Sequence, residues 1–467
     1  MTGSRRSPPV WWVIVATSLG FVVVQLDVTV VNVALPKIST GLGASVSVLQ
    51  WVVDAYSVTF AVLLLSAGSV GDRFGSRRLF MLGFALFAAA SVACGVAPSG
   101  AALIAGRAVQ GIGAALLVPT SLALLNHACA HDDALRARAV GLWTAAGGVS
   151  IAAGPLIGGL LVGAFSWRSI FLVNVPICAA GIAMTVRVPD TDRRADARRL
   201  DAAGQLLAIV SLSGLIGAVI EARPLGLAHP IVIVGAALAI VCGAAFLAVE
   251  RRSPFPMVPP DLFREAKLGP LIAFGTFVNL TYYGIIFVLS LYLQQLLGYS
   301  AVRAGVAYLP LTATFIVSNL ASGWLTGRMG ARIPMLVGSI MGAIGFALLL
   351  RLDAHTPYSS MVPAFLLIPA GMGLAVPSMT TATLAAVHKK WAGTASALLN
   401  TARQAGGAIG VAIFGALVAG GRTRIVFGLH SASAASAVLL ILAALLAWRG
   451  VEHGARMGDT LRGTTRG

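Results

Sequence analysis

Long apolar runs divide this chain. The apolar residues fall into fourteen runs of about 20 residues, and a helix of that length crosses a hydrocarbon layer of about 30 Å. The runs do not alternate between apolar and polar residues, and in lipid only helices and closed barrels satisfy every backbone amide. The pattern therefore predicts an all-α membrane protein with fourteen transmembrane helices. The expected spans, by their approximate ends, are Trp11–Leu35, Gln50–Val70, Leu79–Ala97, Ala101–Leu125, Ala139–Phe165, Ser169–Thr185, Ala202–Ile220, Pro230–Val249, Leu268–Leu297, Ala304–Thr326, Ile333–Leu350, Met361–Val387, Ala402–Ala419 and Ser431–Trp448.

Basic residues are distributed unevenly among the loops between these spans. If both termini are cytoplasmic, the inner segments hold 24 of the 33 Lys and Arg residues, the outer loops hold 7, and Arg107 and Arg403 lie at membrane depth. Loops rich in Lys and Arg stay in the cytoplasm, so this bias predicts that both ends lie inside. The net charge of +17 then follows from topology, because the basic residues form no continuous stripe for nucleic acid. With 58% hydrophobic and 10% charged residues, we expect a lipid bilayer as partner and no nucleic acid.

One short signature occurs twice, eight spans apart. Gly68-x3-Asp72-Arg73-x-Gly75-x-Arg77 follows the second span, and Gly323-x3-Gly327-Arg328-x-Gly330-x-Arg332 follows the tenth. Two repeated six-helix halves with an inserted helix pair explain this offset, and repeated halves around a central site are a general transporter design. The linkers Arg187–Asp201 and Glu250–Lys267 bracket the inserted pair. We expect an N-terminal six-helix bundle at 1–186, a linker with two accessory transmembrane helices at 187–266, and a C-terminal six-helix bundle with a tail at 267–467.

Several motifs together resemble those of the major facilitator superfamily, and within it the fourteen-helix drug:proton antiporter group. Besides the signature after the second span, they are Leu26-Asp27-Val28-Thr29-Val30-Val31-Asn32-Val33-Ala34-Leu35-Pro36, Arg107-Ala108-Val109-Gln110-Gly111, Ser150-x3-Gly154-Pro155-x2-Gly158-Gly159, Trp167-Arg168-Ser169-Ile170-Phe171-Leu172-Val173-Asn174-Val175-Pro176, Tyr292-Leu293-Gln294 and Asn400-Thr401-Ala402-Arg403-Gln404. The text Trp51-x2-Asp54-x-Tyr56 is similar to the methylenomycin-resistance branch. The resemblance covers nearly the whole chain and implies the major facilitator fold, in which two six-helix bundles alternate access to a central site.

Acidic residues are scarce at membrane depth. Of the 16 Asp and Glu residues, Asp27 and Asp54 lie well inside spans, and the second half has none there. An ionisable group at that depth costs roughly 2.5 to 3.5 kcal/mol on insertion scales, so it indicates function. Desolvation favours the neutral carboxyl group, a nearby cation favours the ionised one, and Arg107 is the obvious cation. We expect Asp27, Asp54 and Arg107 to couple transport to protons. The alternative is a permanent Asp–Arg pair that only holds helices together.

Other polar residues within the spans are candidates for a substrate cavity. Gln25, Thr29 and Asn32 share one helix face, whereas Asp27 points roughly the opposite way, so the sequence does not decide which side faces a cavity. For each tyrosine or glutamine, an interhelical hydrogen bond is an equally good reading. The candidate cavity residues are Gln25, Thr29, Asn32, Tyr56, Gln110, Asn279, Tyr282, Tyr283, Gln294, Asn400, Arg403 and Gln404.

The resemblance also implies gating residues. In the loop after the second span these are Gly68, Asp72, Arg73, Gly75 and Arg77, and a carboxylate there could dock on a helix N-terminus. The alternative is that these charges only set the topology. In the fifth span the implied gating residues are Gly154, Pro155 and Gly158. Gly154 and Gly158 lie four positions apart on one face, so close helix packing explains them as well as gating does.

The resemblance implies a proton-coupled exporter of drugs, antibiotics or other lipophilic small molecules, acting as a monomer in the bacterial inner (cell) membrane. Protons would be the coupling ion, and we expect no cofactor and no metal. The lack of acidic residues at membrane depth in the second half favours neutral or monocationic substrates over divalent cations. The main alternative is a facilitator that carries a metabolite such as a sugar or an amino acid. A membrane sensor is a further alternative, but it would need a signalling domain. We do not expect an enzyme, because the sequence shows no nucleophile–base set.

Overall fold

The computed structural model describes residues 9–130, 132–191, 201–253, 256, 262, 267–388 and 391–450, without the side chains of Leu65, Ser69, Asp72, Asp133, Ala134, Ala137 and Ala392. Much of the two expected linkers therefore lies outside the described residues. The chain divides into two compact units. Unit 1 contains Met1–Ser213, Leu238–Met257 and Ser300–Val306, and unit 2 contains Gly214–Ala237, Val258–Tyr299 and Ala307–Gly467. The expected division near residues 186 and 267 stays a prediction.

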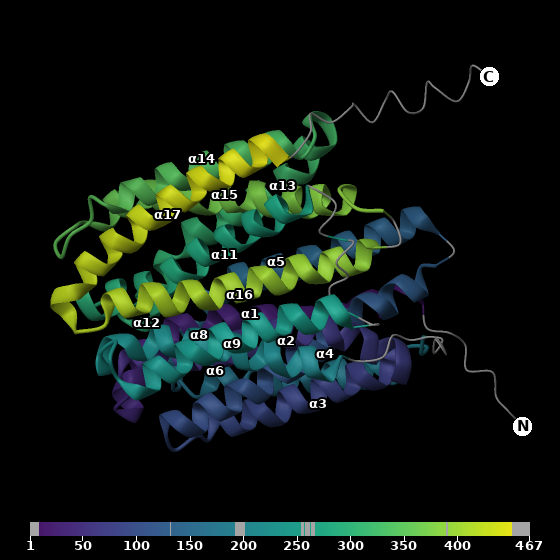
Figure 1. Ribbon diagram of the computed structural model, residues 1–467, viewed down its shortest axis with the longest axis horizontal. Coiled ribbons are helices and arrows are strands. Elements are labelled where there is room, and N and C mark those ends of the chain that lie inside the picture. The colour runs from purple at the N-terminus through teal and green to yellow at the C-terminus, as the bar shows by residue number, and fades with distance from the viewer. Residues whose placement is uncertain are drawn as a thin grey trace, which may run out of the picture. The chain divides into compact units, whose positions relative to one another are not determined.

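The first helices of unit 1 form a bundle around buried aromatic side chains. Helix α1 packs along α5, and α4 packs against both α2 and α3 (Figure 1). Phe80, Phe84 and Phe87 of α3 are fully buried in this bundle. A Cβ at Gly181 would lie within 2.7 Å of the Phe84 ring, so this glycine lets α7 approach α3. The helices are α1 (Val10–Leu42), α2 (Val46–Phe74), α3 (Ser76–Gly95), α4 (Gly100–Ala128), α5 (Asp133–Ala164), α6 (Ser169–Leu172) and α7 (Asn174–Thr185).

Unit 2 holds most of the second half of the chain. Helix α11 packs along α16, and α15 packs against both α13 and α14. A Cβ at Gly410 would overlap the backbone of Leu280, so α16 and α11 approach closely at this glycine. The elements from here to the end of the described chain are α11 (Leu268–Leu291), the π-helix η1 (Tyr292–Leu296), α12 (Ala301–Ala307), α13 (Leu309–Met329), α14 (Arg332–Leu349), α15 (Tyr358–Ala385), α16 (Ala392–Val418) and α17 (Arg422–Gly450).

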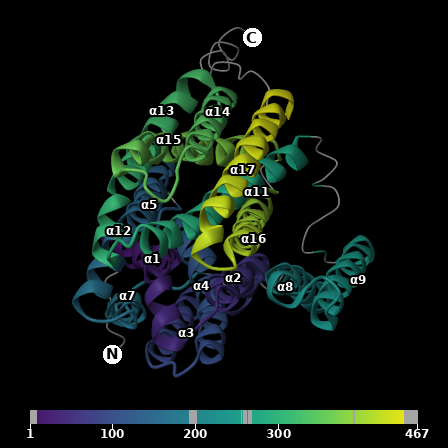
Figure 2. The ribbon, with the colours of Figure 1, turned by 90° about the vertical axis from the view of Figure 1, so that its left-hand side faces the viewer.

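Helices α8 (Ala202–Leu225) and α9 (Pro230–Arg252) lie side by side as a hairpin (Figure 2). Ser211 Oγ on α8 donates to the carbonyl of Ala239 on α9 at 2.8 Å. Gln205 on α8 donates from Nε2 to the carbonyl of Val62 on α2 at 2.9 Å. Most apolar side chains of α9 are exposed, as lipid-facing residues are. The two helices therefore form a pair, and its expected accessory role stays a prediction.

Thirteen of the fourteen expected spans are long apolar helices in the described residues, although their ends do not always match the apolar runs. Among the described residues, thirteen helices are long and apolar enough to cross a membrane, and the shorter segment Ser169–Thr185 is the remaining expected span. That segment breaks at Val173 into α6 and α7. Pro176 lacks the N–H that would bond to the carbonyl four residues earlier, which explains the break.

Three expected boundaries were wrong by seven to ten residues. Helix α1 continues through Pro36 to Leu42, where Gly43 ends it with a left-handed φ of 60°. Helix α16 begins at Ala392 rather than Ala402, and α17 begins at Arg422 rather than Ser431. In each case polar residues interrupt the apolar run without ending the helix. Apolar character marks the part of a helix that suits lipid, while backbone hydrogen bonds set its length.

The repeated signature forms the same turn twice. Gly75 ends α2 with a φ of 96°, and Gly330 ends α13 with a φ of 75°. A positive φ of this size is strained for residues with a side chain, so glycine suits both positions. The next helix begins one residue after Gly75 and two residues after Gly330. The two turns support the interpretation of the signature as an internal repeat.

Candidate functional site

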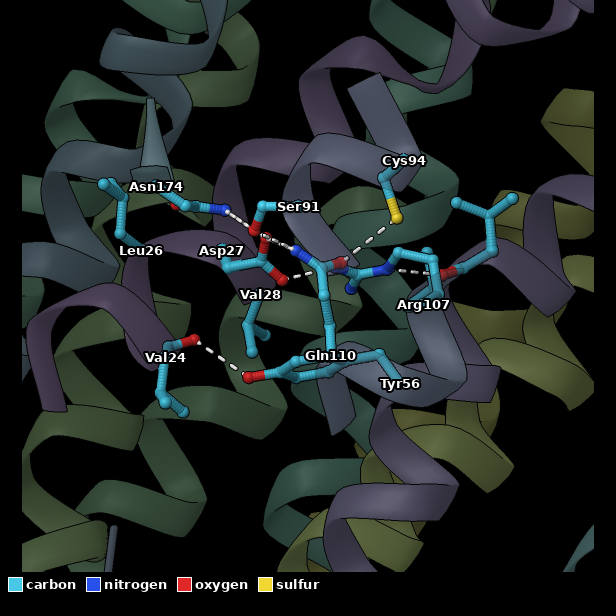
Figure 3. A network of polar contacts seen from close by, with 12 residues as sticks. Val24, Leu26, Asp27, Val28, Tyr56, Ser91, Cys94, Arg107, Gln110 and Asn174 are labelled. Carbon is cyan, nitrogen blue, oxygen red and sulfur yellow. Dashed lines mark hydrogen bonds and ion pairs between the residues drawn. The ribbon is translucent and has the colours of Figure 1, made fainter. Parts of the chain in front are cut away.

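A buried ion pair lies among the helices of unit 1 (Figure 3). Asp27 of α1 and Arg107 of α4 form a salt bridge, and their side chains are 0% and 1% exposed. Arg107 Nε also donates to the carbonyl of Val52 on α2 at 2.9 Å. Its guanidinium carbon lies 4.4 Å from the centroid of the Tyr56 ring, which adds a cation–π contact. The arginine is therefore compensated by a carboxylate, a carbonyl dipole and an aromatic face.

Three uncharged side chains complete this network. Asn174 of α7 donates from Nδ2 to Asp27 Oδ1 at 2.9 Å. Gln110 accepts from Arg107 Nη1 at 2.9 Å and donates from Nε2 to the Ser91 hydroxyl at 2.8 Å (Figure 3). A longer contact of 3.4 Å joins Gln110 Nε2 to Asp27 Oδ1. Both oxygens of the aspartate thus have donors, and the network around the charge pair joins five helices, α1, α2, α3, α4 and α7.

The close approach of α2 and α4 makes this network possible. A Cβ at Gly111 would lie 2.6 Å from the carbonyl oxygen of Tyr56, so any larger residue would push the helices apart. Arg107 lies one turn before Gly111 on α4, and Val52 lies one turn before Tyr56 on α2. The glycine therefore brings the backbones close enough for Arg107 to reach the Val52 carbonyl.

Asn174 and Ser91 were not predicted as site residues. Both are fully buried in apolar helices, and both join the Asp27 network. Asn174 stands within the quoted motif of the sixth span, but the motif alone gives it no partner. A search for every amide side chain at membrane depth would have found it, because such groups need a hydrogen-bond partner in lipid. Ser91 carries no comparable signal, since small hydroxyl residues are common in packed membrane helices.

The environment of Asp54 on α2 contrasts with that of Asp27. It is 0% exposed, and neither carboxyl oxygen has a hydrogen-bond partner among the described residues. An ionised carboxylate without a partner is expensive to bury, so these surroundings fit the neutral, proton-bearing form. The two acidic residues at membrane depth in the first half thus lie in contrasting settings. Asp27 is ion-paired with Arg107, and Asp54 is unpartnered.

The other candidate cavity residues of α1 do not join this network. Thr29 and Asn32 are buried, and Gln25 is partly exposed. The Thr29 hydroxyl donates to the carbonyl of Gln25 at 3.2 Å, and Asn32 Nδ2 donates to the carbonyl of Val28 at 3.1 Å. The side of α1 that carries Asp27 therefore faces the network, while Thr29 lies against α5. A role for these residues in binding substrate stays a prediction.

Helix α5 packs on α1 through its small residues. A Cβ at Gly154 would overlap the Thr29 side chain, and a Cβ at Gly158 would lie 2.8 Å from the carbonyl oxygen of Val30. Pro155 lies between them inside the helix. This close contact is the packing role that the sequence allowed, and a gating role for the three residues stays a prediction.

A second arginine within an apolar span lies in unit 2, and its side chain is partly exposed. Arg403 of α16 donates from Nε to Asn279 of α11 at 3.4 Å and from Nη1 to Asn400 at 3.3 Å. Tyr283 lies one turn beyond Asn279, and a Cβ at Gly407 would lie 2.9 Å from its ring. Four of the predicted cavity residues therefore lie together at the junction of α11 and α16.

The remaining candidates of unit 2 lie along the same helices. The Tyr282 ring stacks on Phe315 of α13, with centroids 6.3 Å apart. Gln294 donates from Nε2 to the Ser290 hydroxyl of its own helical segment at 3.3 Å, and Gln404 is partly exposed. No hydrogen bond between described side chains joins Gln294 or Gln404 to Arg403.

Residues after α7 bind the turn between α2 and α3. Asp190 Oδ1 accepts from the backbone N–H of Arg77 at 2.9 Å, and Thr191 Oγ1 accepts from that of Ser76 at 3.2 Å. Arg77 also donates from Nη1 to the carbonyl of Val188 at 3.1 Å. The first N–H groups of a helix have no partner within the helix, so these contacts cap α3.

A carboxylate does bind the N-terminus of α3, but it is that of Asp190, which was not predicted, and the docking expected of Asp72 stays a prediction. The side chain of Asp72 lies outside the described residues. Arg73 is exposed, with its guanidinium carbon 5.5 Å from the Phe74 ring centroid, and Gly68 faces open space. The gating role of Gly68, Asp72, Arg73, Gly75 and Arg77 stays a prediction.

Metal-binding chemistry is not indicated within the described ranges, where no group of three or more His, Cys, Asp or Glu residues could hold an ion. Among the described residues, the charged groups within the apolar spans include a compensated ion pair, an unpartnered carboxyl group and a weakly bonded arginine. Such groups are typical of proteins that move solutes or protons through a helical bundle.

The fold and these groups define a multi-pass membrane transporter. A family profile described as Major Facilitator Superfamily matches residues 17–411, and the chain belongs to this family. The crystal structure of a peptide transporter, POT, in complex with sulfate has the same fold. Its TM-score is 0.70 at 15% identity, and the match covers 95% of this chain and 96% of that chain.

Several curated relatives are similar over most of the chain. The Methylenomycin A resistance protein of Bacillus subtilis is 38% identical over 407 residues, which cover 87% of each chain. The Multidrug resistance protein Stp of Mycobacterium tuberculosis is 38% identical over 87% of this chain and 75% of its own length. The Puromycin resistance protein pur8 of Streptomyces alboniger is 36% identical over 94% of this chain and 91% of its own.

Proposed function

We propose that this protein is a proton-coupled exporter of lipophilic small molecules, including antibiotics or other drugs. The observation that carries the proposal is its similarity, at 36 to 38% identity, to proteins that confer resistance to methylenomycin A, puromycin and multiple drugs. Transport by alternating access, with α8 and α9 as an accessory pair, follows from the family. The same similarity supports a transporter rather than an enzyme or a sensor.

Asp54 is our choice for the principal proton carrier. Its carboxyl group is fully buried without a hydrogen-bond partner in the described part of the chain, so it suits a bound proton. Asp27 is held by Arg107 and Asn174, and a proton there would first have to displace an ion pair. We infer that Asp54 loads and releases the proton, while Asp27 and Arg107 keep the helices in register and respond when they move.

The experiment uses everted membrane vesicles in which respiration acidifies the lumen. An exporter coupled to protons releases part of this gradient when a substrate is added, and a pH-sensitive dye follows the release. A panel of neutral and monocationic drugs first identifies a substrate for the wild-type chain. We expect Asp54→Asn to abolish substrate-induced proton release while the protein inserts normally, because asparagine has nearly the same shape as the neutral carboxyl group.

The matched control is Asp353→Asn, which changes an aspartate in the exposed loop between α14 and α15. We expect it to leave proton release unchanged. Retention of full proton release by Asp54→Asn would show that Asp54 does not carry the proton. If no drug of the panel releases the gradient in wild-type vesicles, the exporter proposal itself is wrong.

Location and assembly belong to the same proposal. We propose that the protein acts as a monomer in the inner (cell) membrane of a bacterium, with both termini in the cytoplasm. The excess of Lys and Arg in alternate loops supports this orientation. Protons serve as the coupling ion, and no cofactor or nucleic acid takes part. Cysteine labelling of residues introduced near each end, before and after permeabilisation, tests the orientation.

A further inference from the structure

The guanidinium of Arg403 has unused hydrogen-bonding capacity. An arginine offers five N–H donors, and bonds between charged partners are usually about 2.7 to 2.9 Å long. Arg403 has two hydrogen bonds, of 3.4 Å to Asn279 and 3.3 Å to Asn400, and both acceptors are neutral amides. No further hydrogen bond or ion pair reaches it from the ranges that the structure describes. Its side chain is partly exposed, so an incoming group can reach it.

The surrounding helices supply no negative charge. Helices α11, α13, α14, α15, α16 and α17 contain no Asp or Glu residue. A cation at membrane depth without a counter-ion is costly, so such a residue indicates a functional site. Arg107 shows how this chain compensates an arginine that only needs to be stable, since it has a carboxylate and a carbonyl as partners.

Aromatic and small residues pack beside Arg403. A Cβ at Gly275 would lie 3.2 Å from Cγ of Arg403, so the glycine makes room for the arginine stem. Tyr283 fills the next turn against Gly407 and forms a T-shaped pair with Tyr282 at 5.6 Å. Two aromatic rings thus continue the surface that begins at the guanidinium. The arrangement offers a planar cation next to an apolar face.

We propose that Arg403, positioned by Asn279 and Asn400, binds the carboxylate of the transported molecule, so that lipophilic carboxylic acids are a substrate class of this protein. The planar fork of arginine matches a carboxylate through two parallel hydrogen bonds. The two asparagine oxygens orient the fork without neutralising it. The inference rests on the proposed export function and replaces the expectation of neutral or monocationic substrates with one that includes acids.

The test compares an acid with its ester on the purified full-length protein. Dansylglycine is a fluorescent aromatic carboxylic acid, and its methyl ester has nearly the same body without the charge. Fluorescence titration measures binding of each. We expect wild-type protein to bind the acid about ten-fold or more tightly than the ester, as a hydrogen-bonded charge contact contributes. Arg403→Gln should lower affinity for the acid to that for the ester, and Arg403→Lys should give an intermediate value.

The control variant is Arg422→Gln, which alters an exposed arginine at the start of α17 and should leave both affinities unchanged. The proposal is overturned if dansylglycine does not bind, if acid and ester bind equally, or if Arg403→Gln weakens both alike. Because Arg403→Gln could also lower stability, the Arg403→Lys protein, which keeps the charge, provides an independent reading. If Arg403→Lys matches the wild type for the acid, a bidentate contact is excluded.

A second arm separates substrate from lipid. Binding is repeated in nanodiscs of phosphatidylcholine and of phosphatidylglycerol, whose phosphate is a competing anion. A preference for the acid in both lipids supports the proposal, whereas its loss in phosphatidylglycerol would show that Arg403 holds a lipid headgroup. Proton release by a drug in everted vesicles tests the export function separately. If dansylglycine and its ester bind equally but drugs still release protons in vesicles, only the acid site is rejected and the export function stands.

Discussion

Arg107 in unit 1 and Arg403 in unit 2 both lie within apolar helices of this transporter, and their environments differ. Arg107 has a salt bridge to Asp27, a 2.9 Å bond to the Val52 carbonyl and an aromatic ring 4.4 Å away. Arg403 has two neutral acceptors beyond 3.2 Å. The same residue type is therefore fully compensated in one unit and left available in the other.

The difference implies different roles for the two arginines, with Arg107 stabilising the fold and Arg403 binding a ligand. A compensated charge stabilises the bundle as long as both partners stay, and removing one partner leaves a buried charge alone. A weakly bonded arginine contributes little to the fold but keeps its donors for a ligand. Asp27 and Asp54, the acidic residues expected at membrane depth, also lie in unit 1, so we propose that proton chemistry belongs to unit 1 and recognition of a substrate charge to unit 2.

The largest expected effect comes from breaking the ion pair. Asp27→Asn leaves Arg107 buried without a counter-ion, and the cost is about 3 to 5 kcal/mol. Thermal unfolding of the purified protein in detergent should show a large drop in the midpoint. The double variant Asp27→Asn with Arg107→Gln removes the lone charge and should recover part of this loss. Arg403→Gln should change the midpoint far less, and an equal drop would remove the distinction between the two arginines.

A smaller effect is expected from the asparagines that bind each site. Asn174→Leu removes the 2.9 Å hydrogen bond to the Asp27 carboxylate and should cost about 1.5 to 3 kcal/mol. Asn400→Leu removes a 3.3 Å contact to Arg403 and should cost less than about 1 kcal/mol. The same unfolding measurement compares them. A larger loss for Asn400→Leu would mean that the Arg403 cluster is the more important structural element.

The smallest effect concerns the repeated turn. Asp190 and Thr191 cap α3 after Gly75, whereas α14 begins after Ala331, whose side chain cannot cap a helix. Loss of a capping side chain costs about 0.5 to 2 kcal/mol. We expect Asp190→Ala to increase hydrogen exchange at the Arg77 amide, and Asp190→Asn, which keeps an acceptor oxygen, to do so less. Unchanged protection in Asp190→Ala would show that Asp190 does not hold this turn.

Some of the site was predictable because its signal is local. Asp27, Asp54 and Arg107 are ionisable residues within apolar runs. Because charged residues are rare in such runs, the sequence alone was enough to identify them as candidates. The contrast between Asp27 and Asp54 was not predictable, since it depends on which side chains from other helices reach each carboxyl group. Asn174 contacts Asp27 across 147 residues of sequence, and Asp190 contacts Arg77 across 113.

The sequence by itself determined the membrane class, the repeat and nearly all of the spans, because the length and polarity of an apolar run are properties of consecutive residues. It also placed an arginine in each half at membrane depth. Only the tertiary structure decided that one arginine meets a carboxylate and the other meets two amides. Helix packing sets the partners that come from other helices, Asp27 for Arg107 and Asn279 for Arg403, and glycines such as Gly111 and Gly275 act through the distance between helices rather than through the chain around them.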